Sequence, residues 1–211
     1  MKKIIAVAAS LLLACATSFA QFNVNLGYAN STEIYRMDKD KYSVGLNGFT
    51  VGIGYSFELA EDFYFTPSVN YQFATSRDAQ LFNMGKILNV TGRVTEHYIN
   101  VPLRLSYDFA FNPNFKFFVF AGPVASVGLA SNWKISSTSV AAGLKEGETL
   151  DNYKDGDYKR FDIMIGGGAG LKFADQFVIK VGYDYGLINR ATTNGINEHR
   201  GQLTAGIAYL F

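Results

Sequence analysis

Two histidines are the side chains of this chain best suited to acid–base chemistry near neutral pH. His97 follows Glu96 directly, and His199 lies near the end of the sequence. A histidine together with a serine and a carboxylate would form a hydrolytic set. However, no serine stands at a fixed partner spacing, and adjacent residues of a strand point to opposite faces, which separates Glu96 from His97. We predict two solvated histidines and no catalytic residue, with a lipid-active hydrolase as the alternative.

An acidic segment has part of the spacing of a calcium loop. It runs from Asp151 to Asp162. Tyr153 stands at the third position, where Asp or Asn is expected, and Asp162 replaces the closing Glu. We therefore predict an ordinary polar turn, no metal site and no cofactor. The other residues of the pattern are Asp155, Gly156 and Asp157.

A run of glycines resembles a phosphate-binding loop at first sight. Its members are Gly166, Gly167, Gly168 and Gly170. Phosphate loops lead into the N-terminus of a helix, and no helical spacing follows here. We predict that these glycines are small residues that pack inside a barrel or bend its wall.

The overall composition excludes several classes of protein. The 211 residues are 48% apolar, 15% aromatic and only 18% charged, with a net charge of +1. This excludes a disordered tail, a coiled coil and a nucleic-acid-binding arm. A single cysteine excludes a disulfide scaffold and a cysteine zinc site.

The elements that carry these residues repeat with a period of two, which is the period of β-strands. Phe49, Val51 and Ile53, for example, alternate with Thr50 and Gly52. The connections between strands alternate between long and short, which is typical of an up-and-down meander with tight turns at one rim. Eight strands are predicted, over residues 22–30, 45–57, 63–74, 95–109, 116–129, 160–173, 177–187 and 200–211.

The composition of the two strand faces indicates which face is wet. A soluble lipocalin-like barrel, the alternative fold, would carry its charges outside. Here the second face is mostly Gly, Ser, Thr and Asn with few charges, as in the filled interior of a narrow membrane barrel. We predict an all-β, eight-stranded antiparallel up-and-down transmembrane β-barrel. Only the facing of 116–129 stays open, because Phe118 and Phe120 compete with Phe117 and Val119.

The interior charges should pair, because isolated buried charges are costly. We expect Arg104 beside Asp162 or Asp184, and Lys172 and Lys180 beside Asp108. Such a paired network would close the lumen. The network is Arg104, Asp108, Asp162, Lys172, Lys180 and Asp184.

Aromatic residues mark both rims of the predicted barrel, as interfacial girdles require. The short-turn, periplasmic girdle is Phe22, Phe57, Phe63, Phe109, Phe117, Phe173 and Phe177, with Phe211 at the end of the last strand. Rings predicted near the loop rim are Tyr28, Phe49, Phe73, Tyr98, Trp133, Phe161 and Tyr185. Pro67, Pro102 and Pro123 fall within strands, so we expect bulges or broken pairing near the last two.

The first 20 residues have the pattern of a secretory signal peptide. Lys2 and Lys3 precede a short apolar stretch, and a small-x-small site ends at Ala20. We predict cleavage after Ala20 and a mature barrel domain over 21–211. The alternative is a lipoprotein, in which Cys15 is lipidated.

With these features in view, the chain resembles the small outer-membrane β-barrels of Bacteroidota known as PorT-like or outer-membrane β-barrel domain proteins. The similar stretches are HYINVPLRLSYDF (97–109), FKFFVFAGP (115–123), IGGGAGLKF (165–173), VGYDYGLINR (181–190) and AYLF (208–211). The resemblance implies the fold and the outer membrane, without a shared catalytic set. It also implies that Phe211 is the signal read by the outer-membrane assembly machinery.

We therefore expect a non-enzymatic outer-membrane barrel with a closed polar interior. Its long loops would bind an unknown ligand or protein at the cell surface, and its other partners would be outer-membrane lipid and the assembly machinery. Near-balanced charge in the loop over 130–159 points away from nucleic acid. A small porin-like channel is the alternative.

Overall fold

The computed structural model describes residues 20–37, 40–76, 79–81, 90–112, 114–137, 145–154, 158–192 and 195–211. Eight strands in these ranges are long: β1 (Ala20–Met37), β2 (Asp40–Ala60), β3 (Phe63–Thr75), β5 (Val90–Asn112), β6 (Phe115–Ser137), β8 (Phe161–Phe173), β9 (Phe177–Gly186) and β10 (Ile196–Leu210). Two more have three residues each, β4 (Ala79–Leu81) and β7 (Thr149–Asp151). None of the described residues forms a helix that is long and apolar enough to cross a bilayer. The predicted signal peptide and Cys15 lie before the first described residue.

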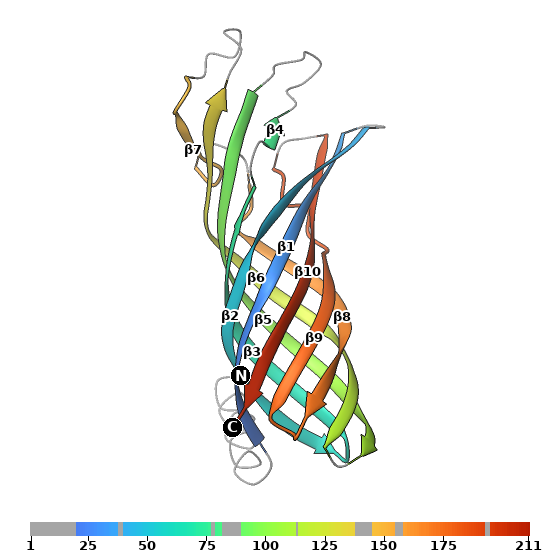
Figure 1. The fold of residues 1–211 in the computed structure, drawn as a ribbon. Coiled ribbons are helices and arrows are strands. Elements are labelled where there is room, and N and C mark those ends of the chain that lie inside the picture. The colour runs from blue at the N-terminus through green and yellow to red at the C-terminus, as the bar shows by residue number, and fades with distance from the viewer. Residues whose placement is uncertain are drawn as a thin grey trace, which may run out of the picture.

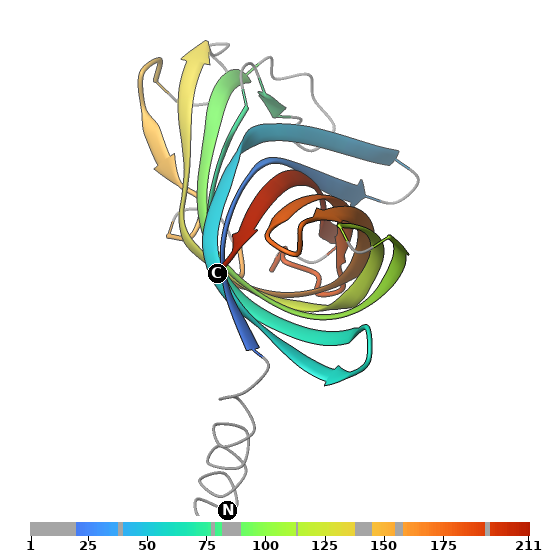
Figure 2. The same ribbon diagram turned by 60° about the horizontal axis from the view of Figure 1, so that its bottom comes forward.

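The eight long strands close into a ring (Figures 1 and 2). Each pairs antiparallel with its neighbour along the chain, and β1 pairs with β10 to complete the circle. The short β4 and β7 extend the sheet beside β5 and β6 near the loop end. The last strand ends beside the first, where the Phe211 N–H donates to the Phe22 carbonyl at 2.8 Å. The predicted eight-stranded up-and-down barrel is confirmed.

Several strands continue through segments that the sequence suggests are loops. β1 and β2 stay paired from Ser31↔Leu46 to Met37↔Asp40, so the predicted loop 31–44 is wrong. β5 and β6 stay paired up to Thr91↔Ser137, which shortens the predicted loops 75–94 and 130–159. The polar residues there still satisfy their backbone groups in a ladder. We call residues 31–37 with 40–46 the β1–β2 extension, and 90–96 with 131–137 the β5–β6 extension; both rise above the barrel in Figure 1.

The outer face of the barrel is apolar and the inner face is polar. Val51, Leu103 and Val181 are 40%, 39% and 50% exposed on the outside, whereas Asp184 is 4% exposed inside. This arrangement suits an exterior in contact with lipid and a lumen filled by side chains. The inverted faces expected of a lipocalin-like barrel are absent from the described strands.

The facing of β6, which alternation left open, follows from its contact with β8. Phe118 lies inside the barrel at 8% exposure, and Val119 lies outside at 40%. A Cβ on Gly170 would lie 2.4 Å from the Phe118 ring, and one on Gly168 would lie 2.7 Å from the Phe120 ring. The glycines of β8 therefore leave room for two inward rings, which confirms their predicted packing role.

The predicted disruption at the prolines is present where β5 meets β6. Their ladder is interrupted between Pro102↔Val124 and Leu105↔Ala121. Within this interruption, Gly122 has φ 153°, and a Cβ there would lie 2.0 Å from the Leu103 carbonyl oxygen. Only glycine fits at this point, and its carbonyl is left free for a side chain.

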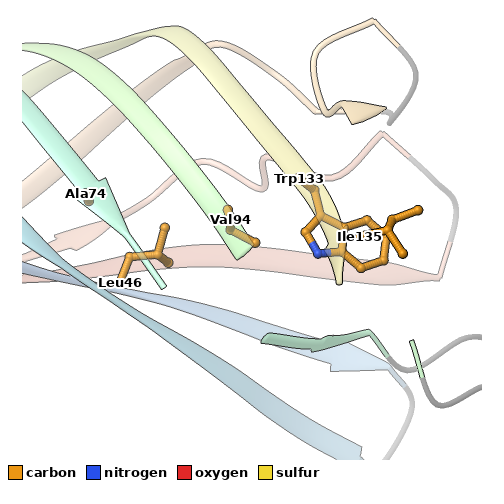
Figure 3. Close-up of a cluster of buried hydrophobic side chains, with 5 residues drawn as sticks. All are labelled: Leu46, Ala74, Val94, Trp133 and Ile135. Atoms are coloured by element: carbon orange, nitrogen blue, oxygen red, sulfur yellow. The ribbon is translucent and has the colours of Figure 1, made fainter. Parts of the chain in front are cut away.

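A small apolar core lies on the inner face of the two extensions and the end of β3 (Figure 3). Its buried members are Leu46, Ala74, Val94, Trp133 and Ile135. Trp133 pairs with Val94 across the strands and shares its inward face, at 4% exposure. Tyr98 is inside as well, at 2%. The prediction that these two rings belong to an aromatic girdle at the loop rim is wrong, because the pleat directs them into the lumen.

Candidate functional site

The periplasmic half of the lumen holds two ion pairs that cross the barrel. Arg104 on β5 reaches Asp184 on β9 and donates to both carboxylate oxygens at 2.7 Å. The same guanidinium donates to the free Gly122 carbonyl at 2.6 Å. Of the two partners expected for Arg104, the structure therefore places Asp184 beside it and not Asp162.

The second pair lies nearer the short-turn rim. Lys172 on β8 donates to Asp108 on β5 at 2.6 Å, and its ammonium lies 4.6 Å from the centre of the Tyr64 ring. Asp108 is 2% exposed. Such pairs in a low-dielectric lumen are retained because either charge alone would be costly there.

Lys180 does not join these pairs. It was expected beside Asp108, yet within the described part of the chain it forms no ion pair and no hydrogen bond. It lines a cavity of about 150 Å³ together with Arg104, Asp184 and Lys172. The prediction of full pairing therefore fails at this lysine, because both nearby carboxylates already have a cation.

A second charged group lies in the lumen nearer the loop end and is built around Arg190. Its guanidinium lies 3.7 Å from Glu33 of β1, 3.8 Å from Glu96 of β5 and 3.3 Å from Glu198 of β10. All four residues are at most 4% exposed. We call Glu33, Glu96, Arg190 and Glu198 the arginine cluster. It ties the segment after β9 to three strands.

Arg200 adjoins the arginine cluster and fills the space below it. Its guanidinium lies 4.0 Å from the centre of the Tyr98 ring and donates to the Ser126 hydroxyl at 2.7 Å. Asp162, at 2% exposure, receives the Ile188 N–H at 3.4 Å. Asp162 therefore belongs to this upper layer and is separate from the lower pairs in which it was expected.

Two carboxyls of the arginine cluster lie in strand ends beyond the apolar outer band, where burial alters their acidity. Burial, together with Glu96 and Glu198, raises the pKa of Glu33 well above its ordinary value, against the effect of Arg190. Burial also raises the pKa of Glu198 to about 7, with Arg190 acting in the opposite direction. The cluster therefore holds a proton near neutral pH, which limits the excess of negative charge around a single arginine.

Tyrosines complete the hydrogen bonding of Glu33. Tyr35 donates to the Glu33 carboxylate at 2.7 Å, and Tyr158 donates to Tyr35 at 3.1 Å. Burial raises the pKa of Tyr35 and of Tyr158, so both hydroxyls keep their protons as donors. The chain segment 158–191, which leads from Tyr158 to Arg190, is thus attached to β1 at both ends.

The two histidines lie on the outer face near the loop rim. His97 Nδ1 is 2.6 Å from the Tyr71 hydroxyl, and the ring packs against Phe73 at 5.3 Å. His199 Nδ1 is 3.0 Å from the Gly186 carbonyl, and its ring stacks on Tyr185 at 5.7 Å. These partners hold both rings in an aromatic rim and bring neither to a serine hydroxyl among the described residues.

The acidic segment is divided between two places. Asp151 receives the Tyr153 N–H at 3.0 Å in a local turn, whereas Asp162 points into the lumen. Residues 155–157 lie outside the described residues. The parts of the chain that the structure describes contain no group of His, Cys, Asp or Glu side chains that could hold a metal ion.

The predicted phenylalanine girdle lies at the short-turn end of the barrel. Its most exposed members are between 36% and 70% exposed: Phe22, Phe109, Phe173, Phe177 and Phe211. Phe57, Phe63 and Phe117 are partly covered by neighbours. Several rings touch across strands, as for Phe22 with Phe211 at 5.8 Å and Phe109 with Phe117 at 5.9 Å. A continuous aromatic band at this height suits a membrane interface.

Sequence reasoning missed the arginine cluster. Glu33, Arg190 and Glu198 all fall in segments interpreted as loops, and Glu96 was considered only as a neighbour of His97. A faint signal existed, because Ser31, Glu33 and Tyr35 continue the alternation of β1. Their convergence on one arginine depends on the closure of the ring.

A model of the outer membrane protein beta-barrel domain family matches residues 16–191. The chain belongs to this family. It is accordingly a protein of the Gram-negative outer membrane, and the short-turn end of such a barrel faces the periplasm. A comparison with curated proteins found no match.

Solved structures of other outer-membrane proteins are similar to this family member. Ail of Yersinia pestis, crystallised with the heparin analogue sucrose octasulfate, is 17% identical, with a TM-score of 0.47 over 92% of this chain and 99% of that one. Neisserial surface protein A is 16% identical, with a TM-score of 0.47 over 91% and 99%. OprG of Pseudomonas aeruginosa is 12% identical, with a TM-score of 0.43 over 92% and 96%.

Proposed function

We propose that this protein is a non-enzymatic, non-conducting barrel whose extracellular end binds a ligand or protein at the cell surface. The observation that carries the proposal is the arginine cluster, which fills the extracellular half of the lumen with buried charged side chains. Displacing Arg190 would leave buried carboxylates without a cation, which is costly. A lumen closed in this way does not suit diffusion of solutes.

The extensions supply the proposed binding surface. They continue the barrel ladder above the outer face that contacts lipid, so they are more rigid than free loops. On their outer faces, Arg36 pairs across the ladder with Lys41, and Arg93 pairs with Lys134. All four side chains are exposed. Like charges directly opposite each other are unfavourable in an isolated sheet, so a partner that presents acidic groups would relieve them.

A pull-down tests the binding proposal. Cells that produce the wild-type protein, or a variant carrying Arg93→Ser and Lys134→Ser, would be treated with a crosslinker. The proteins and glycolipids captured with each would then be compared. We expect capture by the wild type and loss in the variant. A matched variant at the periplasmic rim, Lys116→Ser, should retain capture. Equal capture by all three would contradict a role for the β5–β6 extension.

A small porin-like channel is the second candidate, and the hollow periplasmic half of the lumen favours it. Conductance in planar bilayers separates the two. If the barrel is closed, the purified wild-type protein should show no discrete openings. Stable unitary current steps from the purified protein, absent from protein-free bilayers, would replace our proposal with the channel.

A lipid-active enzyme is the third candidate, because His97 lies on the lipid-facing rim. The test is the lipid A profile of cells with and without the protein, together with lipid turnover by a His97→Ala variant. We expect no change in either measurement. A changed profile that His97→Ala abolishes would establish the enzyme.

The more specific assignment to PorT-like proteins of Bacteroidota is also part of this proposal. It is supported by the matching stretches 97–109 and 165–173, and by the terminal Phe211 expected to serve the assembly machinery. We also propose export by a signal peptide cleaved after Ala20, which predicts a mature N-terminus at Gln21. N-terminal sequencing of the protein from outer membranes tests the cleavage against lipidation at Cys15.

A further inference from the structure

We propose that the periplasmic half of the lumen binds one small monoanion, a halide or a short carboxylate, through Lys180. The site lies below the arginine cluster and on the other side of the barrel from the extensions. The inference therefore goes beyond the proposed surface function and does not depend on it.

The first argument is the cavity itself. It has a volume of about 150 Å³ and extends from Gln21 and Leu210 at the periplasmic rim to Asn100 and Gln202 in mid-barrel. An engineered protein cavity of similar volume holds a benzene molecule, so a chloride or a carboxylate of a few heavy atoms fits. The arginine cluster limits access from the extracellular side, which leaves the periplasm as the source of the ligand.

The second argument is a surplus of positive charge on the cavity wall. Three cations line it, Arg104, Lys172 and Lys180, against two carboxylates, Asp108 and Asp184. Arg104 occupies both oxygens of Asp184, and Lys172 occupies Asp108. The charged neighbour that acts on Lys180 is another cation, Arg104. A bound monoanion would balance the wall, and its attraction is strong because the lumen has a low dielectric constant.

The third argument is that Lys180 has open space and polar neighbours. Its partner across the ladder on β10 is Gly206, which has no side chain to cover it, whereas on the β8 side the Phe118 ring lies over Gly170. Asn25 and Gln202 line the same cavity at 5% and 6% exposure. Within the described residues, Asn25 Nδ2 and Gln202 Oε1 make no hydrogen bond.

These amides complete the recognition. The Asn25 amide can donate to an anion held by the Lys180 ammonium, and Gln202 can accept from the ammonium or, after rotation of its amide, donate as well. Buried polar groups without partners are uncommon in folded proteins. An anion between Lys180 and Asn25 satisfies both the charge and the donor.

The test measures chloride binding to the folded, detergent-solubilised barrel by the line width of ³⁵Cl in NMR spectra, with acetate as competitor. We expect the wild type to broaden the ³⁵Cl line. If the site also takes carboxylates, acetate should reduce this broadening, and if the site takes halides alone, acetate should leave it unchanged. Either result supports the proposal. Lys180→Met should weaken binding about tenfold or more, the size of one charge-assisted contact. Lys180→Arg should restore it.

The matched control is Lys116→Met, which removes a cation that is paired with Asp175 at 2.9 Å and does not line the cavity. It should bind chloride as the wild type does. Folding of each variant is checked by heat-modifiable gel mobility. If Lys180→Met does not fold, Asn25→Ala takes its place and should weaken binding. Broadening absent from the wild type, or unchanged in a folded Lys180→Met or Asn25→Ala variant, overturns the proposal.

Discussion

Replacing Arg190 by methionine tests whether the arginine cluster holds the extracellular end of the barrel together. The substitution keeps a long apolar side chain and removes the cation that faces Glu33, Glu96 and Glu198 at 3.7, 3.8 and 3.3 Å. At pH 8 the three carboxyls are left buried without the cation that pairs with them, and Arg200 is the remaining positive charge that acts on Glu198. Breaking a buried ion pair from one side costs about 3–5 kcal/mol, and we expect a loss in this range.

The loss of stability caused by Arg190→Met should become smaller as the pH falls. The pKa of Glu33 and that of Glu198 are raised in the folded wild type, Glu198 to about 7, so their protonated forms favour the folded state. A raised pKa contributes stability below the unfolded value, near 4.5, and that stability is lost as the pH rises through the folded value. For Glu198, a move from its ordinary value to about 7 corresponds to about 3 kcal/mol. The wild type should therefore lose stability between pH 4.5 and 7.

Without Arg190, Glu33 and Glu198 gain protons still more readily, so the same dependence should be steeper and extend above pH 7. Near pH 4.5 these two carboxyls are neutral in the variant, and the remaining penalty should include the lost contact of the guanidinium with Tyr98 and Tyr158, about 1 kcal/mol. The assay is reversible urea unfolding in lipid vesicles, followed by tryptophan fluorescence, at several pH values. Trp133 lies in the apolar core of the same end and reports on it.

The control is Lys154→Met, which removes an exposed cation with a side chain 77% accessible. Exposed pairs contribute little, so this variant should unfold like the wild type at every pH. The reasoning is refuted if Arg190→Met is as stable as the wild type at pH 8. It is equally refuted if the penalty stays constant down to pH 4.5.

Three further predictions concern the barrel wall and its assembly. Leu103→Arg places a charge on the outer face and should lower the free energy of unfolding by about 2–4 kcal/mol, measured by urea unfolding in vesicles. Thr95→Arg, near the rim, should lower it by about 0–1 kcal/mol. Equal losses would contradict the position of the bilayer. Gly170→Val should clash with Phe118 and reduce the folded yield, and adding Phe118→Ala should recover part of that yield. If Gly170→Val alone folds with the yield of the wild type, the Phe118 ring does not need this space. Phe211→Ser should lower the amount of heat-modifiable protein in outer membranes without lowering its synthesis, and unchanged assembly would remove the proposed signal role of the last residue.

The barrel architecture could be predicted from the sequence because the residue pattern within each strand indicates its two faces. Phe49, Val51 and Ile53 alternate with small residues whatever their neighbours do, and a period of two assigns them to one face. The absence of charge from that face identified lipid as the outer medium. The spacing of the short turns then implied antiparallel neighbours, and an even number of strands implied termini at one rim.

Local signals were weaker where the backbone alone maintains the strand. Residues 31–37 and 131–137 contain the polar residues of a loop, yet the partner strand continues to supply hydrogen bonds. The facing of Phe118 was also undecidable, since β6 has rings at both parities. The facing of β6 is decided by the glycines of β8, which leave space for the Phe118 and Phe120 rings on the inner face.

By itself, then, the sequence determined the strand period, the two faces, the number of barrel strands and the membrane in which they belong, because these depend on patterns within each strand. Only the tertiary structure decided which interior charges meet. Glu33, Glu96 and Glu198 are far apart along the chain and converge on Arg190 when the ring closes, while Lys180 is left beside Arg104 because Asp108 and Asp184 are already occupied. The physical reason is that strand patterning sets the direction of a side chain, whereas its partner across the lumen depends on the register and closure of all eight strands together.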